Sequence, residues 1–418
     1  MVSLQQWLIL SAFIWTAGFP PRTRLFAQGV VPTTDSETEP SAVVTFSTEP
    51  PGSSVVLNGK QIKGRTPITL RLPSGSATVT FRPQREGYKS GSATYSWDAG
   101  ESKRIDFKLP RTFGYVRIVT AQQWSRLELD KHALVAKSDS WERIQAGRHV
   151  ILAFNGRYLG TAKFRLPDEG RVIVSLEWRK ITPDPANFTL IQTRRTKVGS
   201  ADYANLNPSR FVDVKAFWIQ KNEIRVREYR ECVRAKGCSL PGSGENCNWN
   251  ISSREEHPMN CLSALQAAEY AQWFSTLDEF TYRLPTNVEW ESVATQGGTQ
   301  QYPWGMETAL GRCNVCDRSC SWGWHDSSVD DHWPVSAPSG FFRICVGPDQ
   351  VFDLIGNVAE WSTTADRVRY DLRGGSWASP RPLYDPKSPN LKPPEFRDAT
   401  TGFRLAASAF DLSSVEKE

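Results

Sequence analysis

Cysteine is absent from most of this 418-residue chain, and histidine is scarce. All eight cysteines lie between Cys232 and Cys345, and only five histidines occur. The histidines form no His-Glu-x-x-His pair, and the chain has no phosphate-binding loop, Gly-x-Ser-x-Gly elbow or dinucleotide-binding fingerprint. These absences exclude the commonest sequence signatures of zinc proteases, nucleotide-binding proteins and serine hydrolases.

Strong charge and long apolar runs are also missing. The net charge of +5 is small for this length and predicts no nucleic-acid partner. The apolar run from Trp7 to Gly18 is too short for a bilayer, which needs about 20 residues per crossing, so no transmembrane span is predicted. It is typical of a signal peptide, although no Lys or Arg precedes it. We expect a signal peptide over 1–27, a polar linker over 28–41 and a periplasmic, secreted or cell-surface location.

The cysteines form two groups in the sequence. An even number confined to one region of an exported protein predicts disulfides, although the spacing alone does not choose the pairing. A metal knuckle or free thiols are the alternatives. The groups are Cys232, Cys238, Cys247 and Cys261, then Cys313, Cys316, Cys320 and Cys345.

The first folded region reads as short strands over residues 42–110. Asn58-Gly59 lies between two strand-like runs and predicts a hairpin, because both residues tolerate positive φ. Val56 to Lys60, Gly64 to Pro67 and Gly87-Tyr88 resemble the PEGA domain, a small β-sandwich of exported bacterial proteins. Ser53 replaces the alanine that this family usually has.

The next region repeats the first at a nearly constant distance. Val116, Leu127, Gly147 and Tyr158 correspond to Val44, Val55, Gly75 and Tyr88, with offsets of 72, 72, 72 and 70. Such regularity indicates an internal repeat. We therefore expect a second, degenerate PEGA-like β-sandwich over 113–180; one larger all-β domain is the alternative. Pro183 and Pro185 mark the boundary that follows.

Residues 188–408 differ from the preceding region in their sequence pattern. Residues 409–418 are expected to form a tail. Thr286 and Glu289 form a capping box that predicts a helix start, and Ala267, Tyr270, Ala271 and Phe274 share one helical face. The strings 283–291, 353–361, 373–377 and 402–405 resemble the formylglycine-generating enzyme (sulfatase-modifying factor) family. This resemblance implies an irregular α+β domain related to C-type lectin domains, so the whole chain is expected to be multidomain.

The resemblance also implies which chemistry is missing. The family's enzymes use two cysteines after the Gly-Gly-Ser-aromatic step to bind copper and carry out the oxidation. The matching positions here hold Ser379 and Tyr384, and a hydroxyl is a poor Cu(I) ligand. Ala359 replaces a further family residue, a tryptophan. We expect no copper and no catalytic residue.

Calcium is the cofactor that the resemblance still implies, because hard cations prefer carboxylate and carbonyl oxygens. In one expected site, Asp353 and Glu360 supply carboxylates while Gly356 and Val358 supply carbonyls. The alternative is that the two carboxylates only accept hydrogen bonds from loop amides. A second site would use Asn314 and Val315, with a partner left open among Asp326, Asp330 and Asp331.

The sequence thus predicts a non-catalytic extracytoplasmic protein that binds an envelope protein or glycan, or serves as a scaffold. The candidate face surrounds the family's substrate cleft, where an exposed Trp, Arg and Tyr would suit a binding hot spot. Trp377 as a core residue is the alternative to this face. The alternative function is a metal-dependent oxidoreductase with altered chemistry. The residues of the face are Ser376, Trp377, Ser379, Arg381 and Tyr384.

Overall fold

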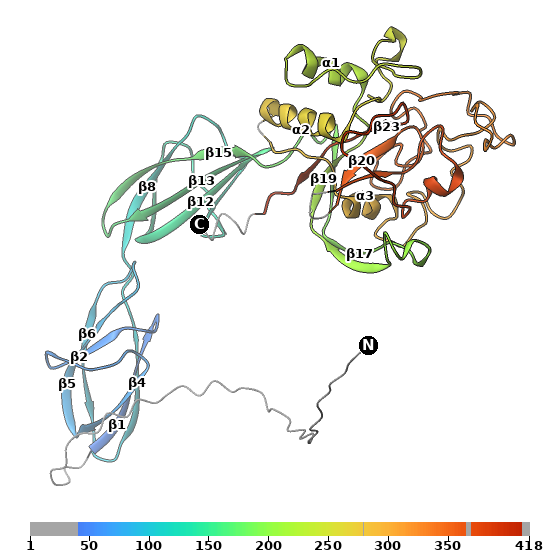
Figure 1. Cartoon of the computed structure of the whole chain (residues 1–418). Coiled ribbons are helices and arrows are strands. Elements are labelled where there is room, and N and C mark those ends of the chain that lie inside the picture. Colours follow the sequence, from blue (N-terminus) through green and yellow to red (C-terminus); the bar gives the residue numbers. More distant parts are fainter. Residues whose placement is uncertain (1–40, 279, 365–368, 412–418) are drawn as a thin grey trace, which may run out of the picture. The chain divides into compact units, whose positions relative to one another are not determined.

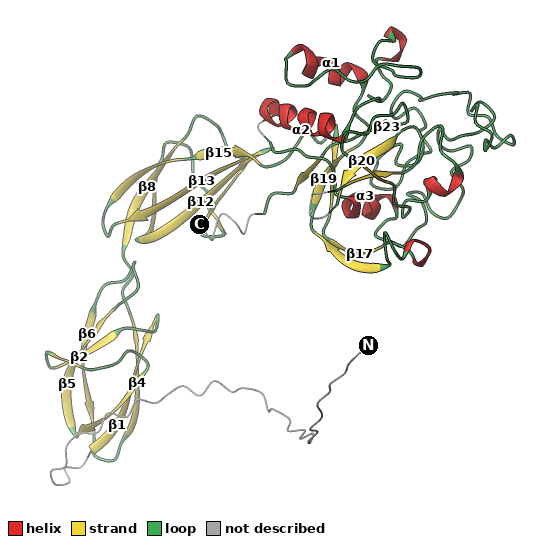
Figure 2. Cartoon of the chain, in the orientation of Figure 1, coloured by secondary structure: helices red, strands yellow, loops and turns green. Residues whose placement is uncertain are grey.

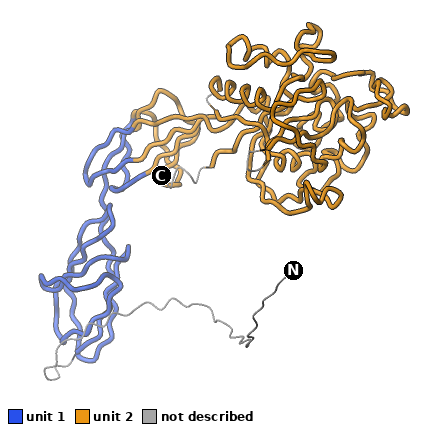
Figure 3. Tube along the Cα trace, viewed as in Figure 1, with its two compact units in different colours: residues 1–117, 140–149, 164–174 blue, residues 118–139, 150–163, 175–418 orange. Residues whose placement is uncertain are grey.

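The computed structural model describes residues 41–278, 280–364 and 369–411. The expected signal peptide, nearly all of the linker and residues 412–418 of the tail lie outside them. The chain divides into two compact units, one of residues 1–117, 140–149 and 164–174 and the other of the remaining residues (Figure 3). No helix within the described residues is long and apolar enough to cross a membrane.

The first module has no helix among its described residues and consists of two sheets (Figures 1 and 2). Their orders are β4-β1-β7 and β3-β2-β5-β6, and β1 pairs antiparallel with β4 but parallel with β7. Alternating side chains of β1 and β5, including Phe46 and Phe81, are fully buried, and with Trp97 they form the core. The strands are β1 (Ser41–Glu49), β2 (Ser54–Leu57), β3 (Lys60–Gln61), β4 (Ile68–Pro73), β5 (Gly75–Arg82), β6 (Gly91–Trp97) and β7 (Ser102–Lys108).

The following strands repeat this order. Their sheets run β11-β8-β14 and β10-β9-β12-β13-β15, so adding seven to each strand number of the first module reproduces both orders, with β15 added at one edge. The compact units divide residues 113–180 between them. A second PEGA-like module therefore stays a prediction, which the repeated strand order supports. The strands are β8 (Phe113–Val119), β9 (Arg126–Leu129), β10 (His132–Ala133), β11 (Trp141–Gln145), β12 (Gly147–Asn155), β13 (Tyr158–Leu166), β14 (Arg171–Ser175) and β15 (Glu177–Lys180).

One turn recurs in atomic detail. Asn58 has φ of 46°, and its Oδ1 accepts a hydrogen bond from Thr78 N at 2.8 Å. Asp130 has φ of 50°, and its Oδ1 accepts from Val150 N at 2.9 Å. A short polar side chain tolerates the left-handed region and can bond the neighbouring strand at once. Both turns close a hairpin, as expected for Asn58-Gly59.

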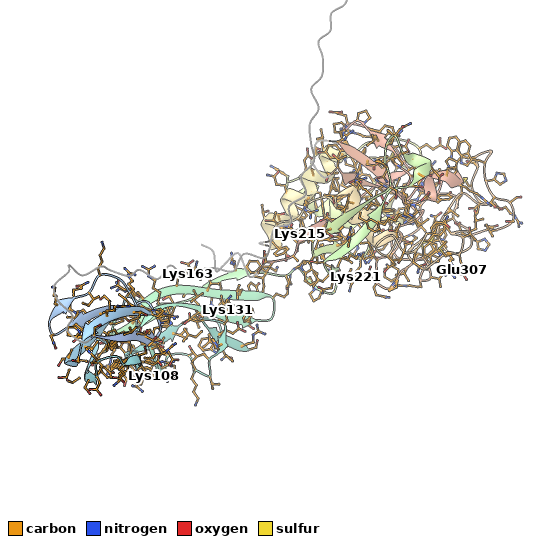
Figure 4. The ribbon with its side chains drawn as sticks, turned by 90° about the horizontal axis from the view of Figure 1, so that it is seen from below. Lys108, Lys131, Lys163, Lys215, Lys221 and Glu307 are labelled. Atoms are coloured by element: carbon orange, nitrogen blue, oxygen red, sulfur yellow. A yellow bond between two sulfur atoms is a disulfide. The ribbon has the colours of Figure 1, made fainter. Side chains whose placement is uncertain are left out.

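Few helices and short strands make up the C-terminal domain. Its sheets run β16-β19-β24, β17-β18 and β22-β21-β20-β23. Residues 295–358 contain no helix or strand. Local bonds organise this stretch: Glu307, labelled in Figure 4, pairs with Arg312, and its carbonyl accepts from Trp304 Nε1 at 3.0 Å. The strands are β16 (Phe188–Ile191), β17 (Arg194–Val198), β18 (Arg210–Val214), β19 (Phe217–Gln220), β20 (Ala359–Thr363), β21 (Tyr370–Arg373), β22 (Leu391–Lys392), β23 (Thr401–Gly402) and β24 (Ala406–Ser408).

Two of the helices, α2 and α3, lie where the sequence predicts them. The capping box places Thr286 at the N-cap of α3, with Thr286 Oγ1 accepting from Glu289 N at 3.2 Å and Glu289 Oε2 accepting from Thr286 N at 2.8 Å. Ala267, Tyr270 and Ala271 of α2 are buried. The α-helices are α1 (Val226–Arg234), α2 (Ala264–Asp278) and α3 (Asn287–Ala294); the 3-10 helices are η1 (Ala201–Tyr203), η2 (Ser252–Arg254) and η3 (Arg381–Tyr384).

Every cysteine of the chain is in a disulfide, and each pair lies within one of the two predicted groups. The bond from Cys313 to Cys345 closes the longest loop, across the stretch without regular structure. The pairs are Cys232–Cys238, Cys247–Cys261, Cys313–Cys345 and Cys316–Cys320.

Candidate functional site

The turn from Asp353 to Glu360 is tightly packed against the neighbouring loop. Asp353 and Asn357 have φ of 55°, and Gly356 has φ of 80°. A Cβ at Gly356 would lie 2.1 Å from Asn314 O, so only glycine fits. The turn leads directly into β20, and this places Glu360 in the domain interior.

Glu360 is fully buried and is engaged on both oxygens. Arg404 Nε and Trp290 Nε1 donate to its Oε2 at 2.7 and 2.8 Å, and Arg404 Nη2 donates to its Oε1 at 2.5 Å. Arg404, also fully buried, further donates to the carbonyls of Gln220, Lys221 and Phe352. This ion pair joins β20, the segment that follows β23 and the end of β19 into one buried polar network.

Two further carboxylates lie in this network, and one was not expected from the sequence. Asp353 Oδ2 accepts from Gly340 N at 2.5 Å, and burial raises the pKa of Asp353 to about 6 against the effects of this bond and of Arg404. Glu223 is fully buried, and its Oε2 accepts from Ser339 Oγ and Asn357 Nδ2 at 2.9 and 2.8 Å. Burial, with the charges of Asp353 and Glu360, raises the pKa of Glu223 well above its usual value.

Of the calcium ligands expected at this turn, the carboxylates of Asp353 and Glu360 repel each other electrostatically, and both already accept hydrogen bonds. Glu360 already has a guanidinium partner, which lowers the gain from adding a cation. The Oε1 of Glu223 has no hydrogen-bond partner among the described residues. The buried carboxylates of Asp353, Glu360 and Glu223 outnumber the one guanidinium, that of Arg404, which is hydrogen-bonded in this network, and a cation would reduce their mutual repulsion.

The second expected calcium site contains a buried oxygen that accepts no hydrogen bond from the described residues. Asn314 is buried, and its Oδ1 has no partner among the described residues, while its Nδ2 donates to Val335 O at 2.9 Å. Of the three candidate acids, Asp331 contacts this loop: its Oδ2 accepts from Val315 N at 3.2 Å. Asp326 instead pairs with Arg381, and Asp330 with His332. Burial raises the pKa of Asp331 to about 6.

These oxygens fit a hard cation better than a soft one. An amide oxygen and carboxylates are ligands of calcium. The described residues contain no group of three or more His, Cys, Asp or Glu side chains placed to hold a metal on their own. A calcium ion would therefore rely partly on carbonyl oxygens, as expected from the sequence.

Ser379 and Tyr384, which we expect to match the two thiols of the family, are bonded to their own surroundings. Ser379 Oγ accepts from Ser376 N at 2.9 Å and lies 2.9 Å from Ser376 Oγ. Tyr384 OH donates to Ser379 O at 2.6 Å and accepts from Cys316 N at 2.7 Å. Burial raises the pKa of Tyr384, so its hydroxyl stays protonated at neutral pH.

The candidate binding face is not exposed as a set. Ser376, Trp377 and Tyr384 are 1%, 5% and 4% exposed, so the expected exposed Trp and Tyr are core residues in this structure. Arg381 alone of the expected hot-spot residues is largely exposed, and it pairs with Asp326. The loop after Cys316 bonds to this segment, since Trp324 Nε1 donates to Ala378 O and Cys316 N donates to Tyr384 OH, and local sequence does not reveal this arrangement. A role of these residues in binding stays a prediction.

Family comparisons agree with this architecture. Residues 179–409 match the sulfatase-modifying factor enzyme 1-like domain, and residues 41–112 match the PEGA domain. The first match covers more than half of the sequence, so the chain belongs to the sulfatase-modifying factor enzyme 1-like family.

Curated relatives differ in their activities. The chain is 29% identical to the formylglycine-generating enzyme of Thermomonospora curvata over 187 residues, covering 38% of this chain and 58% of that protein. It is 31% identical to the inactive Cα-formylglycine-generating enzyme 2 of Mus musculus over 186 residues (40% and 53%). It is 27% identical to the hercynine oxygenase of Mycobacterium tuberculosis over 252 residues (48% and 55%). The chain thus spans about half the length of these relatives.

Proposed function

We propose that the protein is a non-catalytic extracytoplasmic binding or scaffold protein of the cell envelope, periplasmic or displayed at the surface. One observation carries this proposal: the protein has no thiol to bind copper. All eight cysteines are in disulfides, and Ser379 and Tyr384 occupy the positions of the family's catalytic pair.

The contacts of these two residues support a structural role. Copper(I) prefers soft thiolate ligands, whereas Ser379 and Tyr384 are hydroxyl side chains. The Tyr384 hydroxyl bridges Cys316 N and Ser379 O. A side chain bonded on both sides is held in place and cannot turn toward a substrate without losing both bonds.

The disulfides support the location. Four disulfides in one domain form and persist in an oxidising compartment outside the cytoplasm. The PEGA module and the repeated strands after it would then serve as spacers or adhesion modules. The family relative named as inactive supports the loss of oxidase chemistry.

Calcium is proposed as a structural cofactor, held mainly at Asn314, Val315 and Asp331, with the network of Asp353 and Glu360 as a second place. When bound, calcium would supply positive charge to buried oxygens and stabilise the loops. Its test is a thermal unfolding curve in calcium against one in chelator. A higher midpoint in calcium, reduced by Asn314→Ala, is expected; identical midpoints would reject this cofactor.

The catalytic alternative, an altered metal-dependent oxidation, rests on the similarity to hercynine oxygenase. Two measurements distinguish the non-catalytic proposal from this catalytic alternative. The purified protein is incubated with copper and a cysteine-containing substrate peptide of formylglycine-generating enzymes, with the Thermomonospora curvata enzyme as positive control, and aldehyde is measured by mass spectrometry. Metal content is measured in parallel. No aldehyde and no stoichiometric iron or copper are expected; either product or metal would overturn the proposal.

A further inference from the structure

The loop between Cys316 and Asp331 exposes two tryptophans side by side. Trp322 and Trp324 are 46% and 49% exposed. Their ring centroids are 5.1 Å apart and their planes differ by 8°, so the indoles stack on each other. Large half-exposed aromatics placed together are costly to leave in water and are typical of a recognition surface.

This pair is held firmly in place. The Cys316–Cys320 disulfide closes the start of the loop, and Asp326 N donates to Cys316 O at 3.1 Å. Arg318 donates twice to Ser327 O, at 2.8 and 3.1 Å. A platform fixed in this way loses little conformational entropy when it binds a ligand.

The loop also covers the segment that carries the former thiol positions. Trp324 Nε1 donates to Ala378 O at 3.0 Å, and Asp326 pairs with Arg381. The Cys316 amide donates to Tyr384 OH. The exposed tryptophans therefore lie next to the segment that contains the buried Ser376, Trp377 and Tyr384, and they provide an accessible surface that these three residues do not.

We infer that the platform of Trp322 and Trp324 binds an uncharged glycan, an inference that rests on the proposed binding function. A sugar ring has a face of C–H groups, which packs against the electron-rich face of an indole, and hydroxyls at its edge. Suitable partners for hydroxyls flank the tryptophans. They are Ser321, His325, Ser327 and Ser328, all exposed, with the Asp326–Arg381 pair beside them.

Size and charge favour this occupant over others. A stable protein interface buries about 800 Å² per partner around an apolar centre, whereas the sequence neighbours of these two indoles are small or polar. The charged side chains of this loop that reach solvent are few and of both signs: Arg318 and Asp330 are exposed, and the exposed Arg381 is paired with Asp326. This balance offers no unpaired basic cluster that would attract an anionic polysaccharide.

The test uses the full chain on a printed array of neutral and anionic glycans, followed by titration with the strongest neutral oligosaccharide. Trp322→Ala is expected to weaken binding at least about tenfold, a hot-spot effect. Trp324→Phe keeps an aromatic face but loses the bond to Ala378, and a smaller weakening is expected. Phe341→Ala is the matched control, because Phe341 is 53% exposed in the same domain; it should bind like the unmodified protein.

Near-UV circular dichroism checks that each variant folds. If Trp322→Ala does not fold, Trp322→Phe replaces it. The smaller ring of phenylalanine is then expected to weaken binding about threefold. No neutral glycan bound, binding to anionic glycans only, or neutral binding unaffected at Trp322 would each overturn the inference. A protein captured from envelope extract by the unmodified chain but lost in the Trp322 variant would also overturn it, in favour of a protein ligand. These outcomes leave the non-catalytic assignment standing, since aldehyde and metal measurements test that separately.

Discussion

The first module and the C-terminal domain reach a fixed structure by different means. Residues 41–112 have no cysteine, and two sheets enclose a core that includes Phe46 and Phe81. The C-terminal domain leaves residues 295–358 without helix or strand, and it contains all four disulfides and a buried ion pair. Backbone ladders hold the first structure, whereas cross-links and buried polar contacts hold the second.

This difference indicates which changes should destabilise each region. A sheet distributes its hydrogen bonds along many residues, so one substitution removes a small part of them. A loop-rich domain depends on a few bonds between distant residues, so the loss of one frees a long segment.

Reduction of the disulfides should separate the two regions most. Losing a native disulfide costs about 2–5 kcal/mol, and four losses together exceed the stability of a typical domain. We expect the C-terminal domain to unfold in dithiothreitol while residues 41–112 keep their structure. Limited proteolysis with mass spectrometry of the fragments measures this. Equal resistance of both regions in reducing buffer would contradict the comparison.

Removal of Arg404 should have the next largest effect. Arg404→Ala leaves Glu360, Asp353 and Glu223 buried without their guanidinium, and this should lower the free energy of unfolding by about 3–5 kcal/mol. Urea titration followed by tryptophan fluorescence measures it. Arg227→Ala is the control, because the exposed Arg227–Glu256 pair should contribute less than about 1 kcal/mol. Similar losses in both variants would refute a special role for the buried pair.

Acid should destabilise the C-terminal domain through His257. Burial, with a smaller effect of Arg254, lowers the pKa of His257 to about 4, although the contact with Ser336 opposes this. The unfolded chain therefore takes up a proton first, near pH 6.5. The stability from neutral His257 is complete above pH 6.5 and is lost as pH falls toward 4, by about 3 kcal/mol.

The variant His257→Gln isolates this contribution from the raised pKa values of Asp331 and Asp353, which change stability in the opposite direction. Urea unfolding of both proteins at several pH values gives the difference. That difference should shrink as pH falls from 7 to 4, and a constant difference would show that His257 does not titrate as inferred.

The smallest effect is expected at the repeated turns. Asn58→Ala removes the bond to Thr78 N and places alanine at positive φ, so it should cost the first module about 1–2 kcal/mol. Asp130→Ala is its counterpart, with loss of the bond to Val150 N and a similar cost. Calorimetry of each variant gives the change. A large effect at one turn and none at the other would argue against their equivalence.

Local patterns predicted the fold well, because they act over a few residues. The capping box at Thr286, the hairpin at Asn58-Gly59 and the buried face of α2 follow from spacing alone. The family motifs identified the C-terminal domain, and the repeated offset predicted an internal repeat without predicting the order of its strands. The disulfide pairing needed the structure, because spacing allows many pairings within each group.

The site was less predictable, because it depends on contacts between distant residues. Nothing near Glu223 in the sequence reveals that it lies in one network with Asp353 and Glu360. Trp377 and Trp324 are both tryptophans in polar surroundings, yet the first is buried and the second is half exposed. Whether each side chain is buried depends on which loop packs against it, and the residues next to it in the sequence do not indicate this.

The repeated strand order has a consequence for how such a protein changes length. Leu57 ends β2, and Asp130 begins the turn that corresponds to Asn58. Deleting residues 58–129 would join these two points and leave β1 and β2 followed by β10 to β14 in the same topological sequence. We therefore expect a chain with this 72-residue deletion to keep one module with the strand order of the first, because the deletion removes one full copy of the repeated order.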